Sequence, residues 1–190
     1  MRMWYVIQVL KGREDAMAGL IARVVPESIL DECFVPKFAT EIKVRGRWIP
    51  CEKELFPGYL IAVTDSPERV EECLLRIPEF ARVLRMGEEY APLAEDEIEI
   101  IGGFTKRGNR VVPMSRAVKD GDRVVVTMGP LVGREGLIRE IHRRKSTAIL
   151  ELNLCGRLVT TRVGLSVVSV PEDPAGKRAM LYKREMLQSA

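Results

Sequence analysis

The sequence has little of the chemistry that metal sites and catalytic sites need. It contains a single histidine, His142, and four cysteines, Cys33, Cys51, Cys73 and Cys155, which lie far apart without a C-x-x-C spacing. Zinc sites and the disulfide frameworks of small proteins depend on closely spaced or numerous cysteines. We therefore expect no metal, no cofactor and no disulfide framework, and we expect a reduced, cytoplasmic protein.

Long apolar segments are also missing. No apolar run reaches the roughly twenty residues that a membrane-spanning helix requires. The opening M-R-M-W-Y-V-I-Q-V-L-K-G has too short an apolar stretch for a secretory signal and lacks a small-residue cleavage site. The sequence thus predicts no contact with a membrane.

Nothing in the sequence indicates an enzyme. His142 has no nucleophile or carboxylate placed to orient it, so no catalytic triad is expected. Glu95, Asp96, Glu97 and Glu99 fall on a predicted helix, where a solvated acidic face is a simpler interpretation than paired acid–base catalysis. The segment G-P-L-V-G-R-E-G has the wrong end for a phosphate-binding loop. We predict no catalytic residues.

Charge is distributed unevenly along the chain. Residues 1–103 contain 13 Lys and Arg against 19 Asp and Glu, whereas residues 104–117 contain four basic residues and no acid. Residues 118–171 contain nine basic residues against five acidic ones, and the whole chain has a net charge of +3. The positive charge therefore lies in the second half, which favours an acidic partner there.

Short β-rich runs dominate from Lys119 to Val170. Glycine-containing turns separate them, and strands this short favour a small closed barrel because closure leaves no edge unpaired. Gly133 and Gly136 flank a tight entry into one strand, where a Cβ would be excluded. The predicted strands are residues 123–127, 134–141, 146–152, 157–162 and 167–168.

The first half has the pattern of an α+β domain. The order β-α-β-β-β-α-β favours an antiparallel sheet with flanking helices on one side. Helices are expected after Glu14, after a Ser66 N-cap followed by Pro67, and over residues 94–101. The expected strands are residues 4–9, 33–36, 53–63 and 79–84, with a hairpin over residues 41–48.

Four parts follow from these patterns. Residues 1–103 form the α+β domain, and residues 104–117 form an exposed basic linker with no helical stripe. Residues 118–171 form the all-β barrel. Residues 172–190 form a tail in which one short helix is expected.

Two sets of motifs carry a resemblance to known families. The segment with Gly121, Gly129, Pro130, Gly133 and Gly136 resembles a KOW motif, which opens small Src-homology-like barrels. Before it come W-Y-V-I-Q at 4–8, V-P at 35–36, F-P-G-Y at 56–59 and R-I-P at 76–78. Their order and approximate spacing resemble those of the NusG family of transcription elongation factors. A basic hairpin, F-P-G-Y and a later KOW segment are more specific together than any one of them alone.

This resemblance implies a partner and a set of contacts. Members of the family bind the clamp helices of RNA polymerase through the first domain and suppress pausing and termination. An exposed aromatic residue on a rigid strand is a good anchor for a pair of helices. The alternative is that Trp4, Tyr5 and Phe56 are core residues. We expect a monomer whose polymerase-binding residues are Trp4, Tyr5, Phe56, Pro57, Gly58 and Tyr59.

Two departures from the family pattern indicate a specialised paralog. Housekeeping members carry an aromatic residue just before G-R in the barrel, which docks a ribosomal protein, and Cys155 stands there in this sequence. The linker and the turn after His142 are both basic, which resembles LoaP-type antitermination factors. That resemblance implies recruitment by a hairpin in leader RNA through phosphate contacts. The predicted RNA-binding residues are Lys106, Arg107, Arg110, His142, Arg143, Arg144, Lys145 and Arg157.

Several alternatives stay open from the sequence. A run of basic residues is often only a solvated turn, with no ligand. One alternative is that the chain is a general housekeeping NusG-type factor. Another is that it is a translation-linked RNA-binding protein with a KOW barrel. An enzyme with a KOW appendage is the least favoured, because it needs a cleft with perturbed acids.

Overall fold

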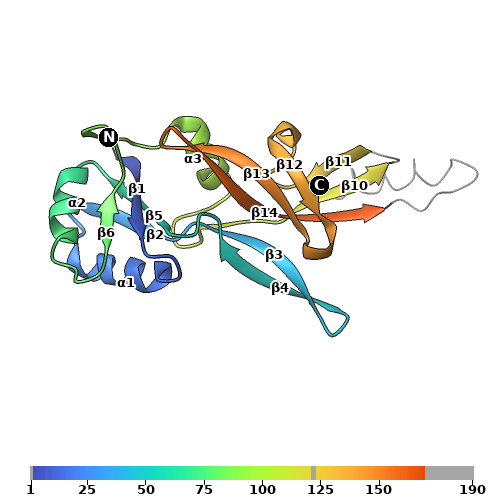
Figure 1. Ribbon diagram of the computed structural model, residues 1–190, viewed down its shortest axis with the longest axis horizontal. Helices are drawn as coiled ribbons and strands as arrows, with labels where there is room; N and C mark the ends of the chain where they lie inside the picture. The colour runs from blue at the N-terminus through green and yellow to red at the C-terminus, as the bar shows by residue number, and fades with distance from the viewer. Residues whose placement is uncertain (1, 121–122, 170–190) are drawn as a thin grey trace, which may run out of the picture.

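The computed structural model of the chain describes residues 2–120 and 123–169 (Figure 1). The expected tail helix in residues 172–190 lies outside the described residues, as does Gly121. No helix within the described ranges is long and apolar enough to cross a membrane. The elements of the N-terminal part, residues 2–112, are β1 (Met3–Val9), α1 (Glu14–Val24), β2 (Leu30–Phe34), β3 (Lys37–Val44), β4 (Arg47–Glu54), β5 (Tyr59–Thr64), α2 (Pro67–Leu74), β6 (Ala81–Val83), β7 (Arg85–Met86), β8 (Glu89–Tyr90), α3 (Glu95–Gly102) and β9 (Val111–Val112).

A four-stranded antiparallel sheet, in the order β2-β5-β1-β6, forms the centre of the N-terminal part. Successive side chains of a strand point to opposite faces, so β1 contributes to two cores. Tyr5 and Ile7 share a core with Met17 of α1 and Val70 of α2, while Val6 faces the other way. The predicted antiparallel sheet is confirmed, and α1 and α2 cover one face of it, but the prediction that all helices lie on one side was wrong, because Ile101 of α3 packs with Val6 on the other face.

The hairpin of β3 and β4 projects from this sheet as a long two-stranded ribbon (Figure 1). Its turn is Arg45-Gly46, and both residues have positive φ, 49° and 83°, as a two-residue hairpin turn requires. The predicted hairpin over residues 41–48 is therefore the outer end of a longer one. The predicted strand over residues 53–63 was wrong as a single element, because the turn with Pro57 and Gly58 divides it between β4 and β5.

The C-terminal sheet has five strands in the order β11-β10-β14-β13-β12, with β10 parallel to β14. Among the described residues no ladder joins β11 to β12, so the predicted closure of a barrel is only partly realised in backbone pairing. The two predicted strands at 157–162 and 167–168 are one continuous strand. The elements are β10 (Ser115–Asp120), β11 (Arg123–Met128), η1 (Glu135–Leu137), β12 (Ile138–His142), η2 (Arg143–Lys145), β13 (Thr147–Leu154) and β14 (Arg157–Ser169).

The segment 104–117 is not the exposed, irregular linker that its composition predicted. It contains β9, which pairs with the start of β3, and the beginning of β10. Val112, Ser115 and Ala117 are buried. The strands were missed because they are only two and six residues long. Apolar and polar residues alternate over too short a stretch there to be recognised as a strand pattern, and a Gly and a Pro interrupt it.

Arg110 fixes this segment to the N-terminal sheet. Its guanidinium binds both carboxylate oxygens of Glu32, at 3.1 Å from Nε and 2.5 Å from Nη2. It also lies over the rings of Trp4 and Phe34, at 5.0 and 4.7 Å from their centroids. Each side chain of the Arg110–Glu32 pair is only 13% exposed. A bidentate, stacked pair of this kind is much stronger than a surface ion pair.

The C-terminal sheet packs directly against the N-terminal part. One apolar cluster includes Leu55 and Phe56 from the N-terminal part and Leu152 and Val163 from the C-terminal sheet. Thr161 donates a hydrogen bond to the carbonyl of Leu55. The backbone of β14 also approaches β3 closely. The contact is thus a shared core closed by hydrogen bonds.

Gly164 marks the closest approach. A Cβ at this position would lie 2.0 Å from the carbonyl oxygen of Ala39 in β3. No side chain can be accommodated there without moving the two strands apart. The other atoms that it would meet belong to the flexible side chain of Met114.

We predict that Arg110→Ala destabilises the fold. The change leaves Glu32 without its partner and removes the cation from Trp4 and Phe34. We expect the free energy of unfolding to fall by about 3 kcal/mol, the lower end for a broken buried pair, because some exposure remains. Arg107→Ala is the matched control, since the Arg107 side chain is 67% exposed, and it should cost less than about 1 kcal/mol. Equal losses in urea titrations of the two variants would contradict this role.

We predict that Gly164→Ala separates the two parts and exposes Cys155. Burial, with the Glu97 carboxylate nearby, raises the pKa of the Cys155 thiol to about 11, so alkylation at pH 8 should be very slow in the native chain. In Gly164→Ala the Cys155 thiol should react at least about tenfold faster, because it becomes exposed. Site-resolved mass spectrometry measures this.

Two internal comparisons make that experiment decisive. Gly19→Ala is the control substitution, since a Cβ there meets only a guanidinium nitrogen at 4.0 Å. Cys73, buried within the N-terminal part, should keep its slow rate in every variant. If Cys155 reacts at the same rate in Gly164→Ala and Gly19→Ala, the close approach does not hold the parts together.

Candidate interaction surfaces

The two aromatic motifs of the N-terminal part lie on neighbouring strands. β1 pairs with β5 in antiparallel register, with Gln8 opposite Tyr59 and Trp4 opposite Val63. The F-P-G-Y motif forms the turn that enters β5, closed by a 3.1 Å hydrogen bond from the Tyr59 N–H to the Phe56 carbonyl. The sheet therefore places W-Y-V-I-Q and F-P-G-Y side by side, although residues 9–55 separate them in the sequence.

A buried carboxylate holds this turn. Glu14 is 4% exposed, and its Oε1 accepts a hydrogen bond from the Gly58 N–H at 2.7 Å. The Gly58 carbonyl in turn accepts from the Val9 N–H at 2.9 Å. Gly58 has a φ of 89°, which favours glycine. The sequence suggested only a helix-dipole role for Glu14, and its contact with the motif was missed because the pairing is long-range.

The predicted polymerase-binding residues are not equally accessible. Tyr5 and Phe56 are 4% and 3% exposed, so their prediction as surface anchors was wrong for this conformation and the core alternative holds. Tyr5 faces the helices, and burial, followed by the Glu68 carboxylate, raises the pKa of its phenol. Gly58 is buried, whereas Pro57 is exposed.

Trp4 and Tyr59 lie at the edge of this surface. Both are partly buried and pack against the cluster shared with the C-terminal sheet. The Trp4 ring stands edge-on to Phe34, with 5.4 Å between ring centroids. The predicted surface is therefore reduced to Trp4, Pro57 and Tyr59, with the C-terminal sheet covering its centre.

Helix α3 contacts the C-terminal sheet through its acids. One oxygen of Glu97 accepts from the Ala94 N–H at 2.7 Å, and the other accepts from the Cys155 N–H at 2.9 Å. Glu99 forms an ion pair with Arg134, with 2.6 Å between Oε1 and Nη2. The prediction of a purely solvated acidic face was wrong for these two residues, because their partners lie far away in the sequence.

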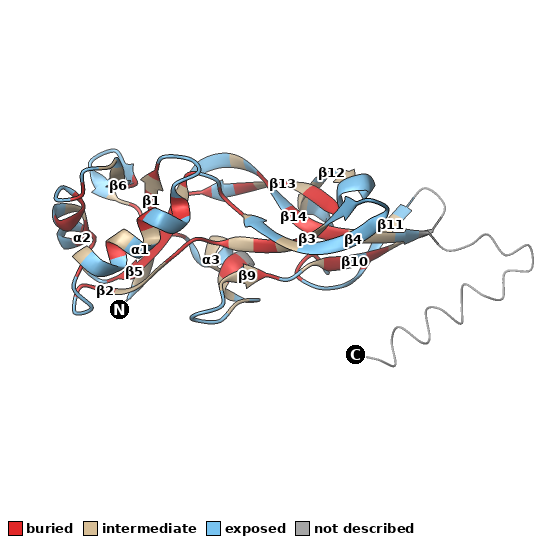
Figure 2. Ribbon diagram, turned by 90° about the horizontal axis from the view of Figure 1, so that it is seen from below, coloured by how far each residue is buried: buried red, intermediate tan, exposed pale blue. Residues whose placement is uncertain are grey.

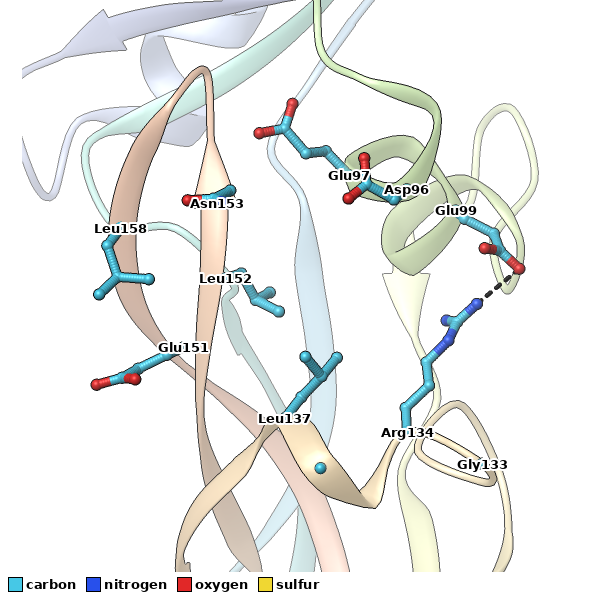
Figure 3. Close-up of a pocket in the computed structure, with 11 residues that line it drawn as sticks. Asp96, Glu97, Glu99, Gly133, Arg134, Leu137, Glu151, Leu152, Asn153 and Leu158 are labelled. Carbon is cyan, nitrogen blue, oxygen red and sulfur yellow. Dashed lines mark ion pairs between the residues drawn. The ribbon is translucent and has the colours of Figure 1, made fainter.

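A shallow pocket of about 500 Å³ lies in this seam (Figure 3). Acidic side chains of α3 line one side, and Leu137, Leu152 and Leu158 of the C-terminal sheet line the other. Within the described ranges no cluster of three or more His, Cys, Asp or Glu is placed to hold a metal ion. The pocket is thus a gap where α3 and the C-terminal sheet do not pack closely against each other.

The predicted RNA-binding residues fall in three separate places. Lys106, Arg107 and Arg110 lie beside β2, where Arg107 Nη2 donates to the Asp31 carbonyl at 2.6 Å. The Arg110 guanidinium is bound to Glu32 and mostly buried. Its prediction as an RNA contact was therefore wrong for this conformation. Lys106 is exposed on its turn.

The remaining predicted RNA contacts lie at opposite ends of the β13–β14 ladder. Arg157 is opposite Leu154 at one end, whereas η2 adjoins the other end, where Thr147 is opposite Gly164. All three residues of η2 are exposed, and the neighbouring His142 lies 3.5 Å from a Glu140 carboxylate oxygen. The structure thus does not unite the linker, Arg157 and η2 into one surface.

Known proteins resemble this chain in sequence and in fold. The family described as "Transcription termination factor nusG" matches residues 2–102, more than half of the 190 residues. The "Transcription termination/antitermination protein NusG" of Thermus thermophilus is 27% identical over 177 residues, covering 87% of this chain and 96% of the relative. The protein of the same description from Campylobacter jejuni is 26% identical over 171 residues, covering 87% and 95%.

A solved structure supports the same assignment of fold. The structure described as "Domain interaction in Thermotoga maritima NusG" aligns with a TM-score of 0.53 and 19% identity, covering 87% of this chain and 94% of that one. The mostly β architecture with few helices is therefore a NusG-like fold. Because the family match spans the larger part of the chain, this protein belongs to the NusG family of transcription termination and antitermination factors.

Proposed function

We propose that this protein is an elongation and antitermination factor that binds RNA polymerase through its N-terminal part. The observation that carries the proposal is the pairing of β1 with β5, the two central strands, which sets Trp4 and Tyr59 on one face of a rigid sheet, with Pro57 in the turn that enters β5. Aromatic side chains on a rigid element lose little entropy on binding and make good anchors. Similarity to relatives named for termination and antitermination supports this role.

The C-terminal sheet covers part of this face. It shares a core with Phe56, and Tyr59 packs against that core, so a polymerase helix reaches the centre of the surface only after the sheet moves away. Polymerase would then bind the arrangement in which the two parts are separated. The bound factor would suppress pausing by stabilising the closed conformation of the polymerase clamp. No bond is made or broken in this mechanism.

Recruitment by a structured leader RNA is the second element of the proposal. The η2 turn supports it, since Arg143, Arg144 and Lys145 are exposed and pair with no carboxylate of the described residues. Such a turn suits phosphates across a duplex groove without reading bases. The RNA would localise the factor near the transcribing enzyme.

A specialised role is favoured over a general one by the position of Cys155. The turn that carries it is docked against α3, where the Cys155 side chain is 6% exposed. In place of an exposed aromatic, the turn presents a small thiol that fits this seam. A LoaP-type paralog is therefore our preferred assignment, with a general NusG-type factor as the second candidate.

We predict that Tyr59→Ala weakens retention of the protein on immobilised core RNA polymerase. Loss of one partly exposed aromatic anchor should lower the affinity roughly tenfold. Leu75→Ala is the matched control, because Leu75 is 82% exposed on the α2 side of the molecule and should bind as the native chain does. Full-strength binding by Tyr59→Ala would remove this residue from the polymerase surface.

We predict that the double variant Arg143→Ala/Arg144→Ala weakens binding of a hairpin RNA. Loss of two phosphate contacts should lower the affinity about tenfold near physiological salt and reduce the steepness of its salt dependence. Filter binding over a series of salt concentrations measures both effects. Arg69→Ala/Arg76→Ala, at two exposed cations near α2, is the control that should change neither. An affinity equal to that of the control would exclude the turn from the RNA site.

A further inference from the structure

The η2 turn lies beside the β3–β4 hairpin, although the two belong to different parts of the chain. Thr40 of β3 donates a hydrogen bond to the Ser146 carbonyl at 3.0 Å. Ser146, which directly follows η2, donates from its hydroxyl to Glu41 Oε1 at 2.7 Å. Ser146 has a φ of 46°, so the backbone turns sharply at this contact. These bonds fix the basic turn next to the ribbon (Figures 1 and 2).

Six exposed cations lie on the two elements that meet at this junction. The end of the hairpin contributes Lys43, Arg45 and Arg47, and the turn contributes the three residues of η2. All six are exposed, none pairs with an acid among the described residues, and neither residues 42–49 nor residues 143–145 contain an acid.

The carboxylates of the neighbouring residues bind other groups or lie farther along the ribbon. Glu41 accepts the Ser146 hydroxyl, and Glu140 faces His142. Glu52 lies farther along the ribbon, opposite Ala39. The hairpin end is thus cationic although the N-terminal part that carries it is acidic overall, which a composition count of that part conceals.

Apolar side chains alternate with the cations on the ribbon. Ile42, Val44, Trp48 and Ile49 are between 39% and 45% exposed, and much of the ribbon is exposed in Figure 2. The ammonium group of Lys43 lies 5.8 Å from the centroid of the Trp48 ring. A narrow two-stranded ribbon with basic and aromatic side chains has the dimensions of a groove-binding element.

We propose that the hairpin end and η2 form one binding surface for the phosphate backbone of a nucleic acid duplex. The inference rests on the proposed RNA binding and adds the hairpin residues Lys43, Arg45 and Arg47 to it. Six cations on two adjacent projections supply the positive charge that contacts with several phosphates of a duplex require.

The surface exists only while the two parts are packed together. A duplex bound across the junction therefore stabilises the packed arrangement, whereas polymerase binding requires the separated one. By linkage, each ligand weakens the binding of the other. The duplex would keep the factor in its packed arrangement until polymerase binds the N-terminal part and displaces the duplex.

The first test measures the contribution of each projection. Fluorescence anisotropy follows binding of a labelled 20-base-pair RNA duplex, and a DNA duplex of the same sequence distinguishes the two nucleic acids. The hairpin variant is Lys43→Ser/Arg45→Asn/Arg47→Ser, with asparagine chosen because φ at 45 is 49°. The turn variant is Arg143→Ser/Arg144→Ser/Lys145→Ser, and the control is Lys11→Ser/Arg69→Ser/Arg76→Ser, at exposed positions elsewhere.

Each variant at the junction should lower the affinity at least about tenfold and reduce the salt slope by roughly two to three, while the control does neither. A hairpin variant that binds like the control would overturn the shared surface but leave RNA binding by η2 intact. Displacement of the duplex by polyglutamate at equal charge concentration would also overturn it, in favour of an acidic protein partner.

The second test separates the projections without changing a charge. Gly164→Ala should weaken duplex binding several-fold and strengthen retention by core polymerase. In this background the hairpin variant should cause a smaller further loss than in the native chain. Unchanged duplex affinity, with Cys155 exposed to alkylation, would overturn the shared surface. Loss of polymerase binding would instead argue against the proposed function. If Gly164→Ala does not fold, the exposed charge variants decide the question alone.

Discussion

The packing of β14 against β3 and the F-P-G-Y turn is the contact on which the rest of the structure depends. It merges the open face of the four-stranded sheet and the inner face of the C-terminal sheet into one apolar cluster. Its geometry is set by Gly164, which allows two backbones to touch, and by hydrogen bonds at Thr40, Ser146 and Thr161. Burial of apolar surface supplies the free energy, and the polar bonds fix the orientation.

This contact also explains how two binding surfaces can oppose each other. The face that buries Phe56 is the one that our proposal assigns to polymerase, and the same packing brings η2 to the hairpin. In our proposal, one equilibrium between packed and separated arrangements governs both surfaces: separation favours polymerase binding, and packing favours duplex binding. The Arg110–Glu32 pair holds the connecting segment to the N-terminal sheet, so we expect the proposed separation to begin after β9 and to leave that sheet intact.

Much of the fold follows from local patterns, and the errors occur where distant segments meet. The alternation in β1, the Ser66-Pro67 start of α2 and the turns at Gly129, Gly133 and Gly156 were predicted correctly because each depends on neighbours in the sequence. The prediction that a Cβ is excluded at Gly136 was wrong, because Gly136 lies in η1 without a positive φ and nothing lies within 4 Å of a Cβ built there. The linker was misread because Arg110 finds its partners, Glu32 and two aromatic rings, far away in the chain. For the same reason Glu97 was taken for a solvated acid.

The sequence by itself determined the class of most elements, the uneven distribution of charge and the motifs that place the chain in its family. These are properties of residue type and spacing, which a linear pattern records directly. Only the tertiary structure decided that Tyr5 and Phe56 are buried, that Arg110 is neutralised by Glu32, and that the β3–β4 hairpin contacts the residue that follows η2. Burial and juxtaposition depend on which faces meet in space, and that is fixed by packing between segments far apart in the sequence, by 78 residues for Arg110 and Glu32 and by 106 for the hydrogen bonds of Thr40 and Thr161.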